Sequence, residues 1–158
     1  MVLDATVREA NFKDSIKKLL LDNRGSLVAH GSVPILFDKS FDDPEVRDKT
    51  LLKWVVCNLG RPQFGTVSEC IVYLLPCTRK DNEGFKLAQL RDRLLGLFFD
   101  PSYPNGQKPV PLYDSSTTPW TIIGYMLPYV SYETGGKVER DETKYKSITL
   151  TLKWGAKA

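Results

Sequence analysis

The chain has 158 residues, of which 42% are hydrophobic and 26% charged, with a formal net charge of +3. This predicts one soluble globular domain over residues 1–158, large enough to bury a hydrophobic core. No apolar run approaches the roughly 20 residues that cross a bilayer, so we expect no membrane partner. The opening MVLDATVREANF lacks the apolar segment of a signal peptide, which predicts assembly or action in the cytoplasm. So small an excess of positive charge does not by itself indicate nucleic-acid binding.

The three cysteines are Cys57, Cys70 and Cys77. Their odd number and wide spacing argue against a disulfide framework and against a zinc knuckle. Cys57 and Cys70 lie within apolar segments, where a reduced cysteine packs as a small hydrophobic side chain. We therefore expect structural rather than reactive thiols.

The first predicted element is a helix over residues 6–24. Thr6 and Glu9 form a T-x-x-E pattern that is typical of a capping box at a helix start. Apolar residues then recur at helical spacing and predict one buried stripe. The members of this stripe are Phe12, Ile16, Leu19 and Leu20.

Three strands are predicted next, over residues 32–37, 51–59 and 67–75. The segment GRPQFGT, residues 60–66, carries two glycines and a proline and predicts a hairpin tip. Neither face of the second and third strands is clearly polar. We therefore expect the sheet to be covered on both sides over much of its area.

A second helix is predicted over residues 83–99. The preceding turn TRKDNEG has one glycine, which is too few for a phosphate cradle, and two acids that would repel phosphate. We expect Asp81 or Asn82 to cap the helix instead. Its predicted buried stripe consists of Leu87, Leu90, Leu94, Leu97 and Phe98.

The C-terminal third predicts an extended segment over 109–114, a strand over 120–134, a charged loop over 135–144 and a final strand over 145–154. In the final strand Ile148, Leu150, Leu152 and Trp154 alternate with polar residues, as in a half-buried antiparallel strand. The whole order predicts an α+β fold, with a mixed, mainly antiparallel sheet of about five to six strands packed by two helices.

No pattern predicts catalysis, a cofactor or a metal. His30 is the one histidine, and no nucleophile signature surrounds any serine or cysteine, so a small hydrolase is the weakest hypothesis. Five acids lack calcium-loop spacing and are interleaved with basic residues, which favours a solvated loop. They are Asp38, Asp42, Asp43, Glu45 and Asp48.

Nucleic-acid binding is the main alternative function, through basic helix faces and the basic hairpin. Arg61 and Phe64 at the tip could stack on or insert between bases. Basic residues nevertheless form no run, and acids lie close to most of them. The sequence favours a hairpin tip that contacts another protein.

Taken in order, the elements resemble the tail terminator, or tail-to-head joining, proteins of long-tailed bacteriophages. The segments that carry this resemblance are VPILF (33–37), KWVVCNLG (53–60), LAQLRDRLLGLF (87–98) and WTIIGYMLPY (120–129). Two short patterns accompany them, F-D-x-x-F (37–41) and L-R-D-x-L (90–94). It is a resemblance of element order and size over roughly residues 5–154.

The resemblance implies a structural virion protein without enzymatic activity, in the tail or neck. Its subunits would form a ring, expected to be a homohexamer, that caps the tail tube, stops polymerisation and docks the head-completion or neck protein. DNA would pass through the lumen. The expected contact residues lie in the hairpin tip and the charged loop, and a heterologous ring uses two different patches of each subunit. They are Arg61, Gln63, Phe64, Lys137, Glu139 and Arg140.

Overall fold

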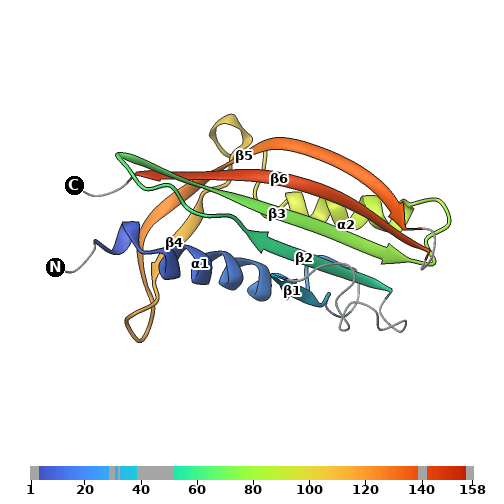
Figure 1. Ribbon diagram of the computed structural model, residues 1–158, viewed down its shortest axis with the longest axis horizontal. Coiled ribbons are helices and arrows are strands. Elements are labelled where there is room, and N and C mark those ends of the chain that lie inside the picture. The colour runs from blue at the N-terminus through green and yellow to red at the C-terminus, as the bar shows by residue number, and fades with distance from the viewer. Residues whose placement is uncertain (1–3, 29–30, 32, 39–51, 139–141, 156–158) are drawn as a thin grey trace.

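The computed structural model describes residues 4–28, 31, 33–38, 52–138 and 142–155. Two α-helices pack on a six-stranded sheet, which confirms the predicted α+β class (Figure 1). The helices are α1 (Glu9–Asp22) and α2 (Phe85–Leu95), and the strands are β1 (Ile35–Phe37), β2 (Lys53–Leu59), β3 (Val67–Arg79), β4 (Val110–Asp114), β5 (Thr121–Val138) and β6 (Thr143–Gly155). Short 3-10 turns cover Ala5–Val7 and Pro104–Gly106.

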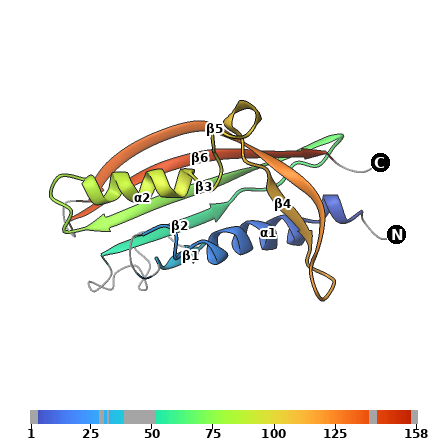
Figure 2. The same ribbon diagram turned by 180° about the vertical axis from the view of Figure 1, so that it is seen from behind.

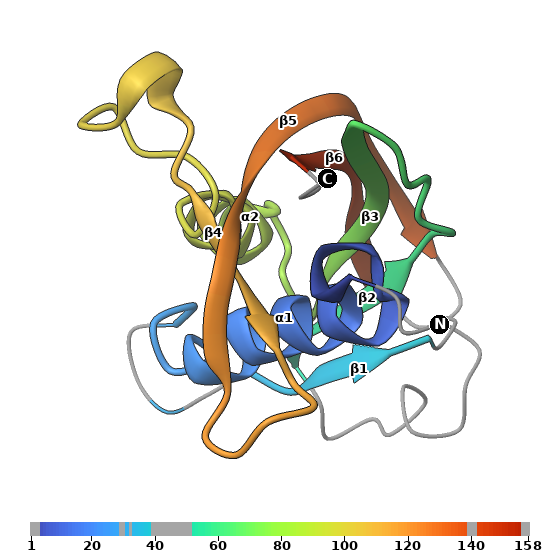
Figure 3. The same ribbon diagram turned by 90° about the vertical axis from the view of Figure 1, so that its left-hand side faces the viewer.

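The strands follow the order β1-β2-β3-β6-β5-β4 across the sheet. Only β1 and β2 run parallel, and every other neighbouring pair is antiparallel. The sheet curls into a half-barrel, as the view along its long axis shows (Figure 3). The helix α2 lies in front of β3 and β6 in Figure 2 and behind them in Figure 1, so it occupies the concave side.

The concave side holds the main core. The inward residues of β6 are those that the alternation predicted, and Ile148, Leu150, Leu152 and Trp154 are all buried. The predicted stripe of the second helix is also confirmed, since all five of its members are buried. That helix is shorter than predicted, and its last two stripe residues, Leu97 and Phe98, lie just beyond its end.

Helix α1 lies against the edge strand β4. The buried Ser15 hydroxyl accepts a hydrogen bond from the Tyr113 N–H at 2.8 Å, and the Asn11 side-chain oxygen accepts one from the Ser115 N–H at 3.0 Å. An open strand edge exposes unpaired backbone groups that invite pairing with another chain. These two side chains satisfy such groups, so α1 protects this edge of the sheet.

The start of α1 differs from the prediction. Residues 5–7 form a separate 3-10 turn, in which the Asp4 carboxylate accepts hydrogen bonds from the Thr6 N–H and hydroxyl. The α-helix then begins at Glu9, after Arg8, which provides no side-chain cap. The predicted capping box of Thr6 and Glu9 is therefore wrong, because Asp4 is the nearer acceptor for Thr6.

The predicted corner before α2 is confirmed. The Asp81 carboxylate accepts hydrogen bonds from the Leu87 N–H at 2.9 Å and the Lys86 N–H at 3.3 Å, and from the Thr78 hydroxyl at 3.1 Å. Burial alone would raise the pKa of Asp81, but these hydrogen bonds hold it below its ordinary value. The chain's own carboxylate thus fills the helix N-terminus, where a phosphate would otherwise bind.

Replacing Asp81 by alanine should lower the free energy of unfolding by about 1–2 kcal/mol, the usual cost of losing a helix cap. Because the folded-state pKa is lowered, this contribution is fully present above the unfolded-state pKa of about 3.9. It is lost as pH falls through the lower folded-state value. Urea unfolding at several pH values would check both points, with the exposed Asn82→Ala as control. A constant difference between Asp81→Ala and wild type down to the lowest pH would contradict this account.

A bidentate ion pair joins α2 to β5. The Arg91 guanidinium donates to both carboxylate oxygens of Glu133, each at 2.8 Å. These hydrogen bonds, opposed by partial burial, lower the pKa of Glu133. Fork-to-fork geometry of this kind is available to arginine and not to lysine.

Replacing Arg91 by alanine should cost about 1 kcal/mol of unfolding free energy, near the upper end for partly exposed pairs. Arg91→Lys should lose most of the same amount, because it keeps the charge but not the second hydrogen bond. Thermal unfolding at neutral pH would measure both. Equal stability of the lysine variant and wild type would show that charge alone matters.

Candidate interaction surface

The convex side of the sheet carries exposed apolar side chains where the three longest strands run together. β3, β5 and β6 have 13, 18 and 13 residues and lie side by side. Their pairing registers place outward-facing residues in three rows across the strands. The rows are Tyr73–Thr149–Tyr132, Ile71–Thr151–Tyr129 and Glu69–Lys153–Leu127.

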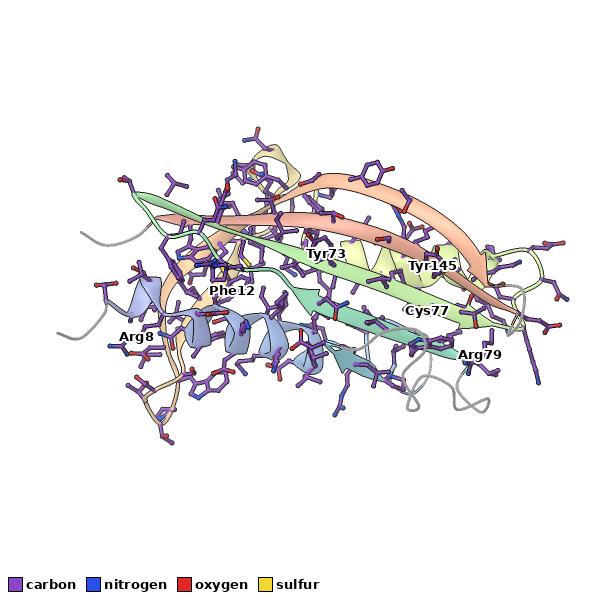
Figure 4. All side chains as sticks on the ribbon, viewed as in Figure 1. Arg8, Phe12, Tyr73, Cys77, Arg79 and Tyr145 are labelled. Atoms are coloured by element: carbon purple, nitrogen blue, oxygen red, sulfur yellow. The ribbon has the colours of Figure 1, made fainter. Side chains whose placement is uncertain are left out.

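We call the apolar members of these rows the convex patch: Ile71, Tyr73, Leu127, Tyr129 and Tyr132. Tyr132 is 65% exposed, and the other four lie between 38% and 40%. Figure 4 labels Tyr73 on β3, within the long central part of the sheet. Both helices contribute to the single core cluster inside the arch of the sheet, so no helix of the described residues covers this patch (Figure 3).

The prediction that both sheet faces are covered holds only at one end. In β2 the four consecutive residues Trp54 to Cys57 are all buried. Trp54 and Val56 form a second small cluster with Cys77, and the Arg79 guanidinium lies 4.6 Å from the Trp54 ring centre. Further along β3, Ile71 and Tyr73 are exposed, so the prediction is wrong there. The same sequence pattern, apolar residues on both faces of a strand, therefore accompanies burial on both faces in β2 but an exposed apolar face in β3.

The rows that contain the convex patch are nearly neutral in charge. The third row holds Glu69 and Lys153 directly opposite each other on β3 and β6. The Lys153 ammonium lies 5.0 Å from the Tyr129 ring centre, within the range of a cation–π contact. Hydroxyl groups lie between the apolar residues, and the Ser131 and Thr151 side chains are hydrogen-bonded at 2.9 Å. Such a surface suits another protein surface of mixed character better than a polyanion.

The predicted hairpin tip is present and ordered between β2 and β3. Arg61, Gln63 and Phe64 are all exposed, as a contact role requires. The Gln63 and Glu69 backbones exchange two hydrogen bonds, and the Phe64 ring meets Trp154 edge-on at 6.3 Å. The tip is therefore held in place by the core it adjoins.

The predicted charged loop over 135–144 is largely strand. β5 continues to Val138 and β6 begins at Thr143, with Lys137 paired to Lys144. Glycines 135 and 136 do not interrupt β5. The Tyr145 ring on the neighbouring strand packs over Gly136 so closely that a Cβ there would lie 2.5 Å from it. Of the other predicted contact residues in this segment, Glu139 and Arg140 lie outside the described residues.

The two predicted contact segments lie at opposite ends of the molecule. Val67, next to the tip, pairs with Gly155, whereas Arg79 at the far end of β3 pairs with Thr143. Thirteen strand residues span roughly 40 Å at about 3.3 Å each. The structure therefore does not bring Arg61–Phe64 together with Lys137, and gives the subunit two distinct ends (Figure 1).

The basic helix residues considered for nucleic acid already have acidic neighbours. Lys13 lies 3.0 Å from Glu9 and Lys18 lies 2.7 Å from Asp22. Arg91 on α2 forms a salt bridge with Glu133. A polyanion would compete with these intramolecular pairs, and the alternative function stays a prediction.

The structure describes the cysteines but only part of the acidic cluster weighed in the sequence. Cys57 and Cys70 are buried, as predicted, and burial raises the pKa of each thiol to about 12. In the part of the chain that the structure describes, no three His, Cys, Asp or Glu side chains gather in a way that could hold a metal. His30 and most of the acidic cluster, residues 42–48, lie outside that part. No helix within it is both long and apolar enough to cross a membrane.

A second surface feature is a groove of about 590 Å³ between α1 and the β4–β5 hairpin. Its lining includes Lys17, Lys18, Leu21, Tyr113, Pro119 and Trp120. The Tyr113 and Trp120 rings lie 6.3 Å apart at an angle of 52°. Leu21 and Trp120 are 39% and 40% exposed, so the groove presents apolar surface to solvent.

Sequence reasoning missed both the convex patch and the groove. Ile71, Tyr73, Tyr129 and Tyr132 read as ordinary strand residues, because one chain does not reveal which side of a sheet its helices cover. The signal for the patch was a surplus of apolar residues on both faces of the same strands. The two helices of the described residues both pack into the core on the concave side of the sheet.

Comparison with known proteins gives the fold and no function. No family model matches the chain, and no curated protein matches its sequence. Fourteen chains of solved structures match it. One of these, which carries no functional description, aligns with a TM-score of 0.60 over 96% of this chain and 99% of its own, at 9% sequence identity. The fold of this chain is therefore shared by a solved structure over nearly the whole length of both chains.

Proposed function

We propose that this chain is the tail terminator subunit of a long-tailed bacteriophage. It forms a ring that caps the tail tube, stops its polymerisation and docks the tail to the head-completion or neck protein. We propose six subunits, the number that the resemblance implies. The subunit is assembled in the host cytoplasm and resides in the virion, and DNA passes through the ring. We assign it no enzymatic step and no cofactor.

The convex patch is the observation that carries this proposal. At 150–250 Å² per aromatic side chain, the exposed fractions of its three tyrosines amount to roughly 300 Å², and the exposed parts of Ile71 and Leu127 add to this. Standard interfaces bury roughly 800 Å² on each partner, of which about 57% is non-polar. The patch therefore has about the apolar area that one such interface needs.

The two ends of the subunit support the same proposal. A ring between tube and neck must present one rim to each of them. The tip with its exposed Arg61, Gln63 and Phe64 lies at one end of the longest strands, and the paired strand ends Val138 and Thr143 lie at the other. Each end would then face one axial neighbour, while the sheet face between them meets the next subunit.

The test adds the purified chain to polymerising tail tube protein from the phage that encodes it. Negative-stain images should show tubes that stop growing and carry a ring at one end. Arg61→Glu, which changes one tip charge, should weaken either tube capping or neck docking while rings still form. Tube growth that continues unchanged at any concentration of the chain would overturn the proposal.

The salt dependence of the binding affinity distinguishes the nucleic-acid alternative from a tail role. Electrostatic binding to DNA or RNA weakens steeply as salt rises, by roughly one decade per decade of salt for each phosphate neutralised. Tight binding with such a slope, weakened further by Arg61→Ala, would favour the alternative over a tail role. Binding that is absent at physiological salt would count against it.

A further inference from the structure

A ring closed by rotation needs two different patches on each subunit, and the convex patch is only one of them. The second must lie elsewhere on the molecule, oriented so that successive copies turn about an axis. Figure 3 shows α1 and the β4–β5 hairpin on the side of the molecule opposite the arch of β5 and β6. The groove between that helix and that hairpin is thus placed where a second patch is required. This step rests on the proposed function.

The groove has the shape and chemistry of an aromatic receptor. Its floor and walls include Tyr113, Pro119 and Trp120, and its volume of about 590 Å³ lies within the range of pockets that enclose small ligands. Large exposed aromatic residues beside a concavity are typical of interface hot spots. In the isolated subunit Trp120 is 40% exposed, so part of its apolar surface stays in water. Covering that surface in an interface would be favourable.

The lysines at the rim already make contacts within the subunit. The Lys18 ammonium lies 2.7 Å from Asp22 and 5.6 Å from the Tyr113 ring centre. Lys17 lies over the Phe37 ring at 5.4 Å. A partner that brought net charge would have to break these contacts, whereas a neutral side chain with a polar tip would not. Tyrosine meets that description, since its ring is apolar and its hydroxyl can hydrogen-bond at a wet rim.

We propose that the groove between α1 and the β4–β5 hairpin receives the convex patch of a second copy of this chain. Tyr132, the most exposed member of the patch, enters the groove, and Tyr129 packs against Trp120. The contact is heterologous: each copy offers its patch to one neighbour and its groove to the other.

Disulfide trapping tests this pairing directly. Leu21→Cys places a thiol on the groove rim, and Ser131→Cys places one beside Tyr132 without removing either tyrosine. The native thiols are buried, so they should not compete. Mixing the two variants under mild oxidation should give a covalent dimer, and either variant alone should give none.

A second pair, Asp22→Cys with Thr134→Cys, repeats the test if the first variants fail to assemble. Linkage of Ser131→Cys with itself would show a face-to-face contact and overturn the inference. If light scattering shows assembly but neither mixed pair becomes linked, the pairing of groove and patch is overturned, while the proposal of a ring still stands. Failure of the wild type to associate at all would overturn the proposed function together with the inference.

Discussion

Replacing Trp154 by alanine should lower the free energy of unfolding by about 3–5 kcal/mol, the range for removing a large buried aromatic side chain. The Trp154 ring stacks on Phe12 at 5.3 Å with an interplanar angle of 8°. Its indole N–H donates to the buried Thr6 carbonyl at 2.8 Å. The residue thereby joins the final strand to both the first turn and the first helix, and its loss opens a cavity between them.

Two control variants separate the causes. Trp154→Phe keeps much of the stacking but removes the hydrogen bond from the indole N–H to the Thr6 carbonyl, so it should cost a smaller amount, about 1–3 kcal/mol. Trp120→Ala removes a tryptophan that is 40% exposed and should cost the monomer much less. Chemical denaturation followed by circular dichroism would compare all three. A Trp154→Ala variant as stable as Trp120→Ala would contradict the packing described here.

Replacing both Tyr73 and Tyr132 by glutamate should weaken self-association at least 100-fold. Each substitution would place an unpaired carboxylate in an interface core, and burying such a charge costs several kcal/mol. Each 1.4 kcal/mol changes a dissociation constant tenfold. The folded subunit should survive, because Tyr73 and Tyr132 are 38% and 65% exposed in it. Sedimentation velocity would measure association, and thermal melting would confirm folding.

Tyr103→Glu is the control for each single tyrosine-to-glutamate substitution. Tyr103 is also 38% exposed, but it lies in the loop before the 3-10 turn at Pro104–Gly106 and outside the convex patch. It should change net charge without changing the mass of the assembly. Equal weakening by Tyr103→Glu would attribute the effect to general charge repulsion and remove the patch from the interface.

The fold could be predicted because periodicity reports burial locally. The alternation of Ile148, Leu150, Leu152 and Trp154 is a property of one strand, and all four residues are buried. The stripe Leu87, Leu90 and Leu94 likewise belongs to one helix. The capping box failed for a comparable local reason, since Asp4 competes with Glu9 for Thr6. Sequence spacing alone does not rank two nearby acceptors.

The candidate surfaces could not be predicted because they arise from arrangement. Tyr73 and Tyr132 are 59 positions apart in the sequence and meet only through their common neighbour Thr149 on β6. Gly135 and Gly136 suggested a loop, yet Tyr145 covers the second glycine and β5 continues past it. The two glycines therefore led the sequence analysis to end the strand too early, whereas Tyr145 on the neighbouring strand packs over Gly136 and β5 continues.

The central claim is that this chain associates with itself into a ring. Its most direct test is the mass of the purified wild-type protein from micromolar to millimolar concentration, by light scattering after size exclusion, with negative-stain images of every large species. We expect one defined oligomer and ring-shaped particles, either in free solution or once tail tube ends are added. A monomer at every concentration, with and without tube ends, would contradict the claim.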